Sequence, residues 1–392
     1  MTEDIFIIAA RRTPIGAFQG ALSGASATQL GAAAVRAAVS DSRLSGDQID
    51  EVILGCVLPA GLGQAPARQA SIAAGVPQSV PTTTINKVCG SGMRSAMLGC
   101  DSIRAGSARI VVAGGFESMT NAPYLLPKAR QGYRMGHGEI LDHLFYDGLQ
   151  NPYDSQMMGH FADATAKKYQ FTRADQDAFA AESVRRAQAA CNDGAFGAEI
   201  APVTVKGRKG DQLVERDEPP FNCDISKIPN LKPAFAKDGT VTAASSSSIA
   251  DGAAALVLMS ASAARAAGAA PLARVVAYAS YAQAPEWFTT APVGAIKRVL
   301  EKTGWAAAAV DLYEINEAFA IVTMAAMRDV GLDQARVNVH GGACALGHPI
   351  GASGARIMTT LVHALKAKGL KRGIASLCIG GGEATAIAIE AV

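Results

Sequence analysis

The sequence predicts an α/β fold made of two similar halves, with a long segment inserted into the first. Short apolar strands alternate with amphipathic helices near both ends of the chain, which is typical of layered α/β domains. The order strand, glycine turn, helix and strand at residues 82–115 also returns at residues 337–382. Equivalent glycines such as Gly92 and Gly354 lie 262 positions apart. Two such halves packed together would bring their equivalent turns to one central face.

The first half shows the strand and helix patterns most clearly. Apolar, β-branched runs predict strands, and apolar residues three or four positions apart predict helices. Strands are expected at 5–10, 51–58, 82–88 and 108–113, and helices at 28–39, at 68–74 and from residue 93 onward. Thr28 is the expected cap of the first helix. Arg11 and Arg12 follow the first strand in a turn with Pro and Gly, where we expect them to be solvated.

The middle of the chain breaks this alternation. Residues 120–160 are rich in Gly, Pro, Tyr and Met without periodicity, which indicates a functional excursion rather than a simple connection. Helices are expected at 161–169 and 172–190, and Thr172 with Asp175 has a spacing close to that of a capping box. Two short strands are expected at 201–205 and 212–215.

The second half resumes the α/β alternation. Strands are expected at 251–258, 311–315, 337–339, 374–378 and 384–389, and helices at 292–302, 317–328 and 351–368. The chain therefore divides into an N-terminal half (1–119), an inserted loop domain (120–248), a return to the N-terminal half (249–271) and a C-terminal half (272–392).

The composition limits the possible classes of protein. Hydrophobic residues make up 49% and charged residues 18% of 392 residues, so a large core is expected. The net charge is +2, and the longest basic cluster, 206–210, is too short to indicate nucleic acid, although it could meet a phosphate. We find no apolar run of transmembrane length and no signal peptide, so no membrane partner is expected. Seven scattered cysteines favour reduced thiols in the cytoplasm over disulfides or a zinc site.

Cys89 lies where a predicted strand turns into a helix, between Val88 and the glycines Gly90 and Gly92. Free N–H groups and the helix dipole at that position favour a thiolate, so we expect a lowered thiol pKa. Small glycines would let another molecule approach the sulfur. A lone cysteine is equally consistent with an ordinary buried thiol unless a base accompanies it.

Three further residues could complete such a site. His348 lies in a Gly-rich turn before Pro349 and can act as a base toward a thiol. Cys378 ends a strand before three glycines, where it could act as a second acid or base and the turn could bind an oxyanion. Asn316 is expected at a helix N-terminus, as a cap or as a polarising donor. No complete GxGxxG or Walker motif appears, which argues against nucleotide-dependent redox or phosphoryl chemistry.

Four motifs in this order closely resemble those of the thiolases over essentially the whole chain. They are Val88-Cys-Gly-Ser-Gly92, Asn316-Glu-Ala-Phe319, Gly347-His-Pro-Ile-Gly-Ala-Ser-Gly354 and Cys378-Ile-Gly380. The resemblance implies a five-layer αβαβα fold of two similar halves with a loop domain that covers coenzyme A. It also implies a homotetramer and a place in fatty acid metabolism. Coenzyme A would be substrate and product, with no further cofactor and no metal.

The resemblance also implies a role for each site residue. Cys89 would carry the acyl group, His348 would activate Cys89 and bind the thioester oxygen, and Cys378 would move the α-proton. Asn316 would hold a water in that oxyanion hole, and the N–H groups of Cys89 and Gly380 would form another. Contacts to the pantetheine and acyl parts of the substrate would come from Met157, Phe235, Ser247, Ala318 and Phe319.

Several residues depart from the usual thiolase pattern without touching the catalytic set. They are Gln156, the loop Thr242–Ser248, Trp287-Phe288, His340, Cys344 and Glu383-Ala384. We expect a biosynthetic-type acetyl-CoA acetyltransferase, because of the bulky Trp287-Phe288 pair and a short-chain-like loop. The alternatives are a degradative 3-ketoacyl-CoA thiolase of broader chain length and a non-catalytic acyl-CoA-binding protein. The second cysteine and a loop domain suited to coenzyme A disfavour a condensing enzyme that uses acyl carrier protein.

Overall fold

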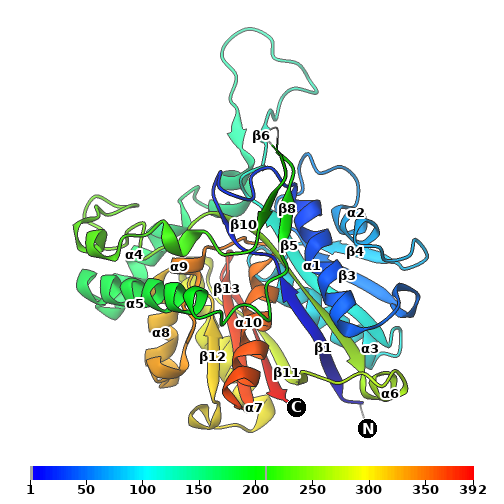
Figure 1. Ribbon diagram of the computed structural model, residues 1–392. Helices are drawn as coiled ribbons and strands as arrows, with labels where there is room; N and C mark the ends of the chain where they lie inside the picture. Colours follow the sequence, from blue (N-terminus) through cyan, green and yellow to red (C-terminus); the bar gives the residue numbers. More distant parts are fainter. Residues whose placement is uncertain (1–2, 208–209) are drawn as a thin grey trace.

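A computed structural model describes residues 3–207 and 210–392 (Figure 1). Arg208 and Lys209, in the middle of the basic cluster noted above, lie outside the described residues. Among the helices of these two ranges, none has both the length and the apolar character that crossing a membrane requires.

A ten-stranded sheet runs through both halves of the chain. Its order is β12-β13-β14-β11-β1-β10-β5-β3-β4, with β2 beside β10. The strands are β1 (Ile5–Arg12), β2 (Gly16–Ala17), β3 (Glu51–Gly55), β4 (Thr82–Ile85), β5 (Ile110–Ser118), β10 (Ala250–Ser260), β11 (Ala273–Ala282), β12 (Leu312–Ile315), β13 (Arg372–Ile379) and β14 (Glu383–Ala391). The antiparallel pair β1–β11 joins the N-terminal half-sheet to the C-terminal one.

The two half-sheets share a strand pairing and the hydrogen bonds at its start. Strand β3 pairs in parallel with β5, as β12 does with β13. Just before β3, the Asp50 carboxylate accepts the N–H groups of Arg109 and Ile110 at the start of β5. Just before β12, Asp311 accepts those of Lys371 and Arg372 in the same way. The expected internal repeat is therefore present down to single hydrogen bonds.

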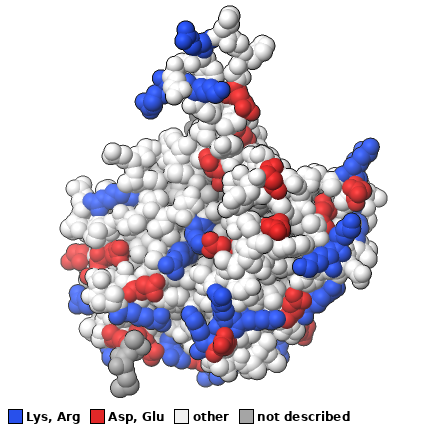
Figure 2. Space-filling view, turned by 180° about the vertical axis from the view of Figure 1, so that it is seen from behind, with Lys and Arg blue, Asp and Glu red and all other residues white. Residues whose placement is uncertain are grey.

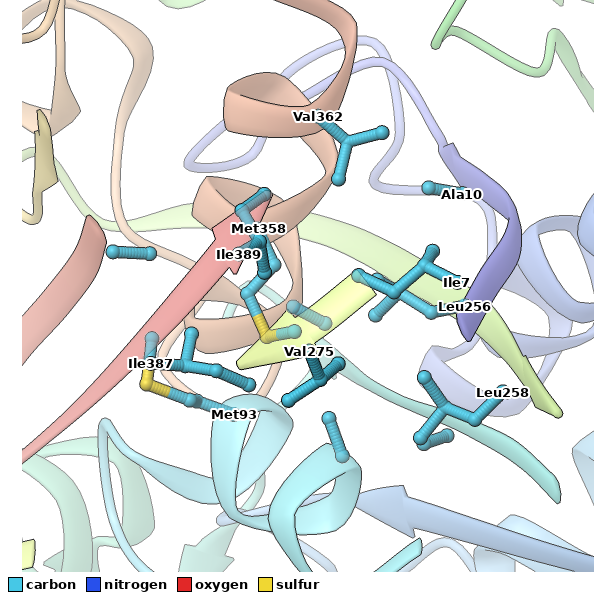
Figure 3. Packing of buried hydrophobic residues seen from close by; sticks show 14 of the residues in the cluster. Ile7, Ala10, Met93, Leu256, Leu258, Val275, Met358, Val362, Ile387 and Ile389 are labelled. Atoms are coloured by element: carbon cyan, nitrogen blue, oxygen red, sulfur yellow. The ribbon is translucent and has the colours of Figure 1, made fainter. Parts of the chain in front are cut away.

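Helices complete five layers around the half-sheets. The bounds are α1 (Ala27–Ser42), α2 (Pro66–Ala73), α3 (Ser91–Arg104), α7 (Ala291–Thr303), α8 (Ala320–Val330) and α10 (Ser353–Lys368). Helices α1 and α2 cover the N-terminal half-sheet, and α7 and α8 cover the C-terminal one. Helices α3 and α10 lie between the half-sheets, where Met93 and Met358 pack among apolar residues of both (Figure 3). The expected αβαβα fold is confirmed.

The inserted segment leaves the sheet at the end of β5 and returns at the start of β10, where Ser118 pairs with Asp251. Its elements are β6 (Tyr124–Leu125), β7 (Leu141–Asp142), the π-helix η2 (Leu144–Leu149), α4 (Met158–Tyr169), α5 (Arg173–Asn192), β8 (Val203–Val205), β9 (Gln212–Val214), η3 (Pro219–Phe221) and η4 (Ile225–Asn230). The connection from β6 to β7 projects from the body of the molecule (Figure 1). The expected capping box of α5 is present at Thr172 and Asp175.

The remaining short elements connect these layers. They are η1 (Gly46–Gln48), α6 (Ala261–Ala266), η5 (Pro285–Thr290), η6 (Ala307–Ala309), η7 (Gln334–Arg336) and α9 (Ala343–Leu346). Two local predictions were wrong. The cap of α1 is Ser26, whose hydroxyl accepts the Gln29 N–H, and not Thr28. The strand expected at 337–339 is reduced to a single bridge between Val337 and Tyr313, because the chain turns at Asn338.

The expectation that Arg12 is solvated was also wrong. Strand β1 continues through Arg12, whose side chain is fully buried. Its guanidinium forms a bidentate pair with Asp217 at 2.7 and 2.8 Å and contacts Glu199 at 2.5 Å. A buried arginine is tolerated when charge and hydrogen bonds are both satisfied in this way. Arg12 thus anchors the inserted segment to the N-terminal half.

Candidate active site

One cavity of about 370 Å³ brings the central sequence candidates together. It lies where the turns of both halves meet the inserted segment. Cys89 comes from the turn before α3, His348 from the turn before α10, and Gly380 from the turn after β13. Of the residues expected to contact substrate, all five line the same cavity: Met157, Phe235, Ser247, Ala318 and Phe319. Cys378 and Asn316 are fully buried behind its wall.

Cys89 is held at the end of a strained turn. The preceding Val88 has φ +48°, a left-handed conformation that is rare for a β-branched residue. The side-chain oxygen of Asn86 accepts the Val88 N–H at 2.8 Å. The Ser91 hydroxyl donates to the Val88 carbonyl at 2.7 Å and accepts the Lys87 N–H at 2.8 Å. These bonds fix the turn so that the Cys89 sulfur faces the cavity.

The expectation of a lowered Cys89 pKa was wrong for the unliganded enzyme. Burial raises the pKa of this thiol to about 11, and the Glu117 carboxylate adds to the rise. The N–H groups of Gly380 and of Cys89 itself act in the opposite direction, but they are the smaller effect. Cys89 is therefore a neutral thiol, which would need a base before it could act as a nucleophile.

His348 presents a free nitrogen lone pair. The Ser353 hydroxyl donates to the Pro349 carbonyl at 2.9 Å, so its oxygen accepts the proton on His348 Nδ1 at 2.5 Å. This leaves Nε2 unprotonated, and it has no partner among the described residues. Burial, with a smaller effect of the Arg356 charge, lowers the pKa of His348 to about 3. With a pKa near 11 for the Cys89 thiol and near 3 for His348, both groups are neutral at pH 7.

Cys378 lies near the end of β13, and Gly380 lies in the turn that follows this strand. The Gly380 N–H is directed at the Cys89 sulfur. Cys378 pairs with Ala384 in the β13–β14 ladder, and its side chain is buried beside Phe288 and Phe319. Burial raises the pKa of the Cys378 thiol well above its ordinary range, and the neighbouring Cys89 charge raises it further. The two sulfurs are thus close enough to influence one another.

Asn316 is not at a helix N-terminus, which corrects that prediction. It follows β12, and α8 begins only at Ala320 with Phe319 as its cap. Its backbone N–H bonds the Ser376 carbonyl at 3.0 Å. Both side-chain polar atoms are buried and have no hydrogen-bond partner among the described residues. An amide in that state suits an ordered water or a substrate atom, because unpaired buried polar groups are costly.

The loop Thr242–Ser248, one of the unusual segments, builds a wall of the cavity. The Ser247 N–H donates to the Ala318 carbonyl at 3.0 Å, and the Ala320 N–H donates to that of Ser245 at 2.8 Å. The His348 N–H donates to the Ser248 carbonyl at 3.0 Å. Three segments that are distant in sequence are thereby tied into one frame around the cavity.

Of the other residues that depart from the usual thiolase pattern, only some lie at the cavity. Phe288 lines it and packs edge-on against Phe161 and Phe319, with ring centroids 6.4 Å apart in each pair. Glu383 forms an ion pair with Lys87, which links the Gly380 turn to the Cys89 turn. The five others line no part of this cavity: Gln156, Trp287, His340, Cys344 and Ala384.

Sequence reasoning missed two residues that support the site. Ser353 stands within the quoted glycine motif, and only its contact with His348 reveals its role. Glu117 is a charged residue in the largely apolar strand β5, and this charge is a signal that the sequence contains. The π-helix η2 was also missed, and its residues Phe145, Gly148 and Leu149 line the cavity.

The fold and the residues around the cavity point to one family of enzymes, and comparison with known proteins finds the same family. Residues 5–262 match the family model "Thiolase, N-terminal domain", and residues 269–391 match "Thiolase, C-terminal domain". The chain belongs to the thiolase family and is an acyltransferase.

Individual relatives match over the whole length. An acetyl-CoA acetyltransferase of Pseudomonas aeruginosa is 50% identical over 389 residues, 99% of each chain. One of Escherichia coli is 49% identical over 390 residues, also 99% of each chain. Among solved structures, the Acat5 thiolase from Ascaris suum in complex with coenzyme A superposes with a TM-score of 0.94. That match covers 100% of both chains at 44% identity.

Proposed function

We propose that this thiolase is an acetyl-CoA C-acetyltransferase, which condenses two acetyl-CoA into acetoacetyl-CoA and CoA through an acetylated Cys89. The observation that carries the proposal is the meeting of Cys89 with the unprotonated Nε2 of His348 and the Gly380 N–H around one apolar cavity. Full-length relatives named acetyl-CoA acetyltransferase support the same reaction.

In the first half-reaction the Cys89 thiol attacks the thioester carbon. His348 Nε2 accepts the thiol proton as the C–S bond forms, because a free thiolate is disfavoured in this burial. The N–H groups of Cys89 and Gly380 stabilise the oxygen of the tetrahedral intermediate. The intermediate collapses, the CoA sulfur leaves and takes the proton from His348, and acetyl-Cys89 remains.

In the second half-reaction another acetyl-CoA loses an α-proton to the thiolate form of Cys378, which acts as the base. The enolate oxygen is stabilised by His348 and by a water that the unpaired Asn316 amide holds. The enolate carbon attacks the acetyl carbon, so a C–C bond forms and the bond between the acetyl carbon and the Cys89 sulfur breaks. The Cys89 thiolate then takes from Cys378 the proton that came from the α-carbon, and acetoacetyl-CoA is released. Run in reverse, CoA cleaves a 3-ketoacyl-CoA.

Coenzyme A would bind as a substrate beneath a loop domain at residues 120–248. The pantetheine and acyl parts would contact Met157, Phe235, Ser247, Ala318 and Phe319, all of which line the cavity. The proposal requires no further cofactor and no metal, because thioester chemistry with a thiol, an imidazole and N–H donors is complete in itself.

Phe288 supports a preference for short chains. It is 3% exposed and locked edge-on between Phe161 and Phe319, so the cavity wall there is bulky and rigid. The test is CoA-dependent cleavage of 3-ketoacyl-CoA substrates from four carbons to long chains. A preference for acetoacetyl-CoA supports the proposal. A rate that holds or rises with chain length would assign the degradative class, and binding without any turnover would indicate an acyl-CoA-binding protein.

We further propose a homotetramer in the cytoplasm, serving the metabolism of short fatty acyl-CoA. Strand β4 is an open sheet edge that could pair with another copy. The projecting connection between β6 and β7 exposes five large apolar residues: Tyr124, Leu126, Tyr133, Met135 and Ile140. Figure 2 shows this projection standing clear of a body on which acidic and basic residues are interspersed. Light scattering should give four copies, and a monomer would contradict this proposal.

A further inference from the structure

A buried carboxylate, Glu117, joins the two halves directly behind the candidate active site. It lies near the end of β5 and is fully buried. Its Oε2 accepts the N–H of Val57 at 2.9 Å and the N–H of Gly351 at 2.9 Å. Its Oε1 accepts the N–H of Leu58 at 3.1 Å and the Cys56 thiol at 3.5 Å. One side chain thus holds a loop of the N-terminal half and the turn that follows His348.

The turn is pressed closely onto this carboxylate. A Cβ atom added at Gly351 would lie 2.6 Å from Glu117 Oε2 and 2.8 Å from the Phe116 carbonyl. Ile350 packs in the same cluster as Val57 and Leu58, with Cys89 against it. The turn has therefore no room to shift toward β5, and the Glu117 bond opposes a shift away from it.

No Lys or Arg within the described residues forms an ion pair with Glu117, so its hydrogen bonds come from backbone N–H groups and the Cys56 thiol. Burial raises the pKa of this carboxyl to about 7, and the N–H bonds lower it. An isolated buried carboxylate is an expensive way to stabilise a fold. The presence of Glu117 at this junction is better explained by the two segments that it holds together, loop 57–58 and the turn at Gly351. His348 lies three residues before Gly351, in the same turn.

We propose that Glu117 is a positioning residue, whose carboxylate fixes the His348 turn against loop 57–58 and thereby sets His348 Nε2 relative to the Cys89 sulfur. The inference rests on the proposed roles of Cys89 and His348. Proton transfer between these two atoms requires a defined distance, and misplacement by about 1 Å can cost about 100-fold in rate. Glu117 itself touches no reacting atom.

The test is Glu117→Gln in the full-length enzyme, with Asp50→Asn as its matched control. Glutamine keeps the shape but places an NH₂ group against an N–H donor. Asp50 also accepts two backbone N–H groups, at the opposite end of β5, far from the catalytic turns. The readouts are the rate of Cys89 acetylation by acetyl-CoA at saturation, followed by mass spectrometry, and the KM for acetyl-CoA.

We expect Glu117→Gln to slow acetylation by roughly 10- to 100-fold with KM changed less than about threefold. Asp50→Asn should leave both unchanged. If Glu117→Gln fails to fold, Gly351→Ala tests the same contact from the other side, because its Cβ displaces the turn while the carboxylate stays. If the folded variant is acetylated at the parental rate, the inference about Glu117 is wrong and the proposed function still stands. Absence of acetylation in the parent enzyme would overturn the proposed function and the inference with it.

Discussion

Gly92 on α3 and Gly354 on α10 pack reciprocally at the centre of the molecule. A Cβ atom at Gly92 would lie 2.7 Å from the backbone nitrogen of Ala355, and one at Gly354 would meet the backbone of Met93 still more closely. Each helix therefore approaches the other through the glycine that the internal repeat makes equivalent. This contact sets the distance between the turns that carry Cys89 and His348.

Gly92→Ala should destabilise the enzyme by about 1–3 kcal/mol, because the added methyl group meets backbone rather than a movable side chain. Chemical denaturation measures the loss. Gly197→Ala is the control, since a single carbonyl at 3.1 Å is the nearest atom there and its φ is not positive. Equal stability of the two variants would show that the helices can separate without cost.

Ser353→Ala should slow Cys89 acetylation by at least about 10-fold. The substitution removes the acceptor for His348 Nδ1–H, so the ring is no longer held with Nε2 as the free base. Single-turnover kinetics with acetyl-CoA measures this step. Ser353→Thr keeps the hydroxyl and should retain more activity than Ser353→Ala. The assigned role fails if the two variants are equally active.

Cys378→Ser should separate the two half-reactions. Formation of acetyl-Cys89 should stay measurable, whereas condensation should slow strongly, because a serine hydroxyl is a far weaker acid than a thiol and does not ionise to serve as the base. Mass spectrometry follows the first step and acetoacetyl-CoA absorbance the second. An equal loss of both rates would undo the proposed division between Cys89 and Cys378.

The buried His348 should make the enzyme acid-sensitive. Its pKa of about 3 in the folded state lies below the ordinary value of 6.5, so the unfolded chain binds the extra proton. Stability from this group is present above pH 6.5 and is lost as the pH falls toward 3. Between pH 7.5 and 5 the free energy of unfolding should fall by about 2 kcal/mol, because one pKa unit corresponds to about 1.36 kcal/mol. Urea unfolding of His348→Asn should show a smaller decrease, and an identical decrease would contradict the assignment.

The sequence predicts the fold well because alternation and repetition are local signals. The helix after Cys89, the glycine turn before α10 and the capping box at Thr172 all follow from residue spacing. Arg12 was misjudged because its partners Glu199 and Asp217 lie about 190 to 205 positions away, beyond any local pattern. Asn338 has a positive φ, which ends the expected strand at 337–339 at one bridge.

The site was predictable in its residue types and less so in its electrostatics. Motifs identify Cys89 and His348, but burial, which raises one pKa and lowers the other, depends on the packed cavity. Glu117 and Ser353 act through contacts across the two halves, and such contacts cannot be read from spacing. The unpaired amide of Asn316 likewise becomes visible only when its surroundings are known.

The most direct test of the whole account is the intact mass of the enzyme after brief exposure to acetyl-CoA. We expect one acetyl group per chain in the parent enzyme, located at Cys89, and none in Cys89→Ala. A stoichiometric acetyl adduct in Cys89→Ala would show that another residue is the nucleophile, and the proposed mechanism would be wrong.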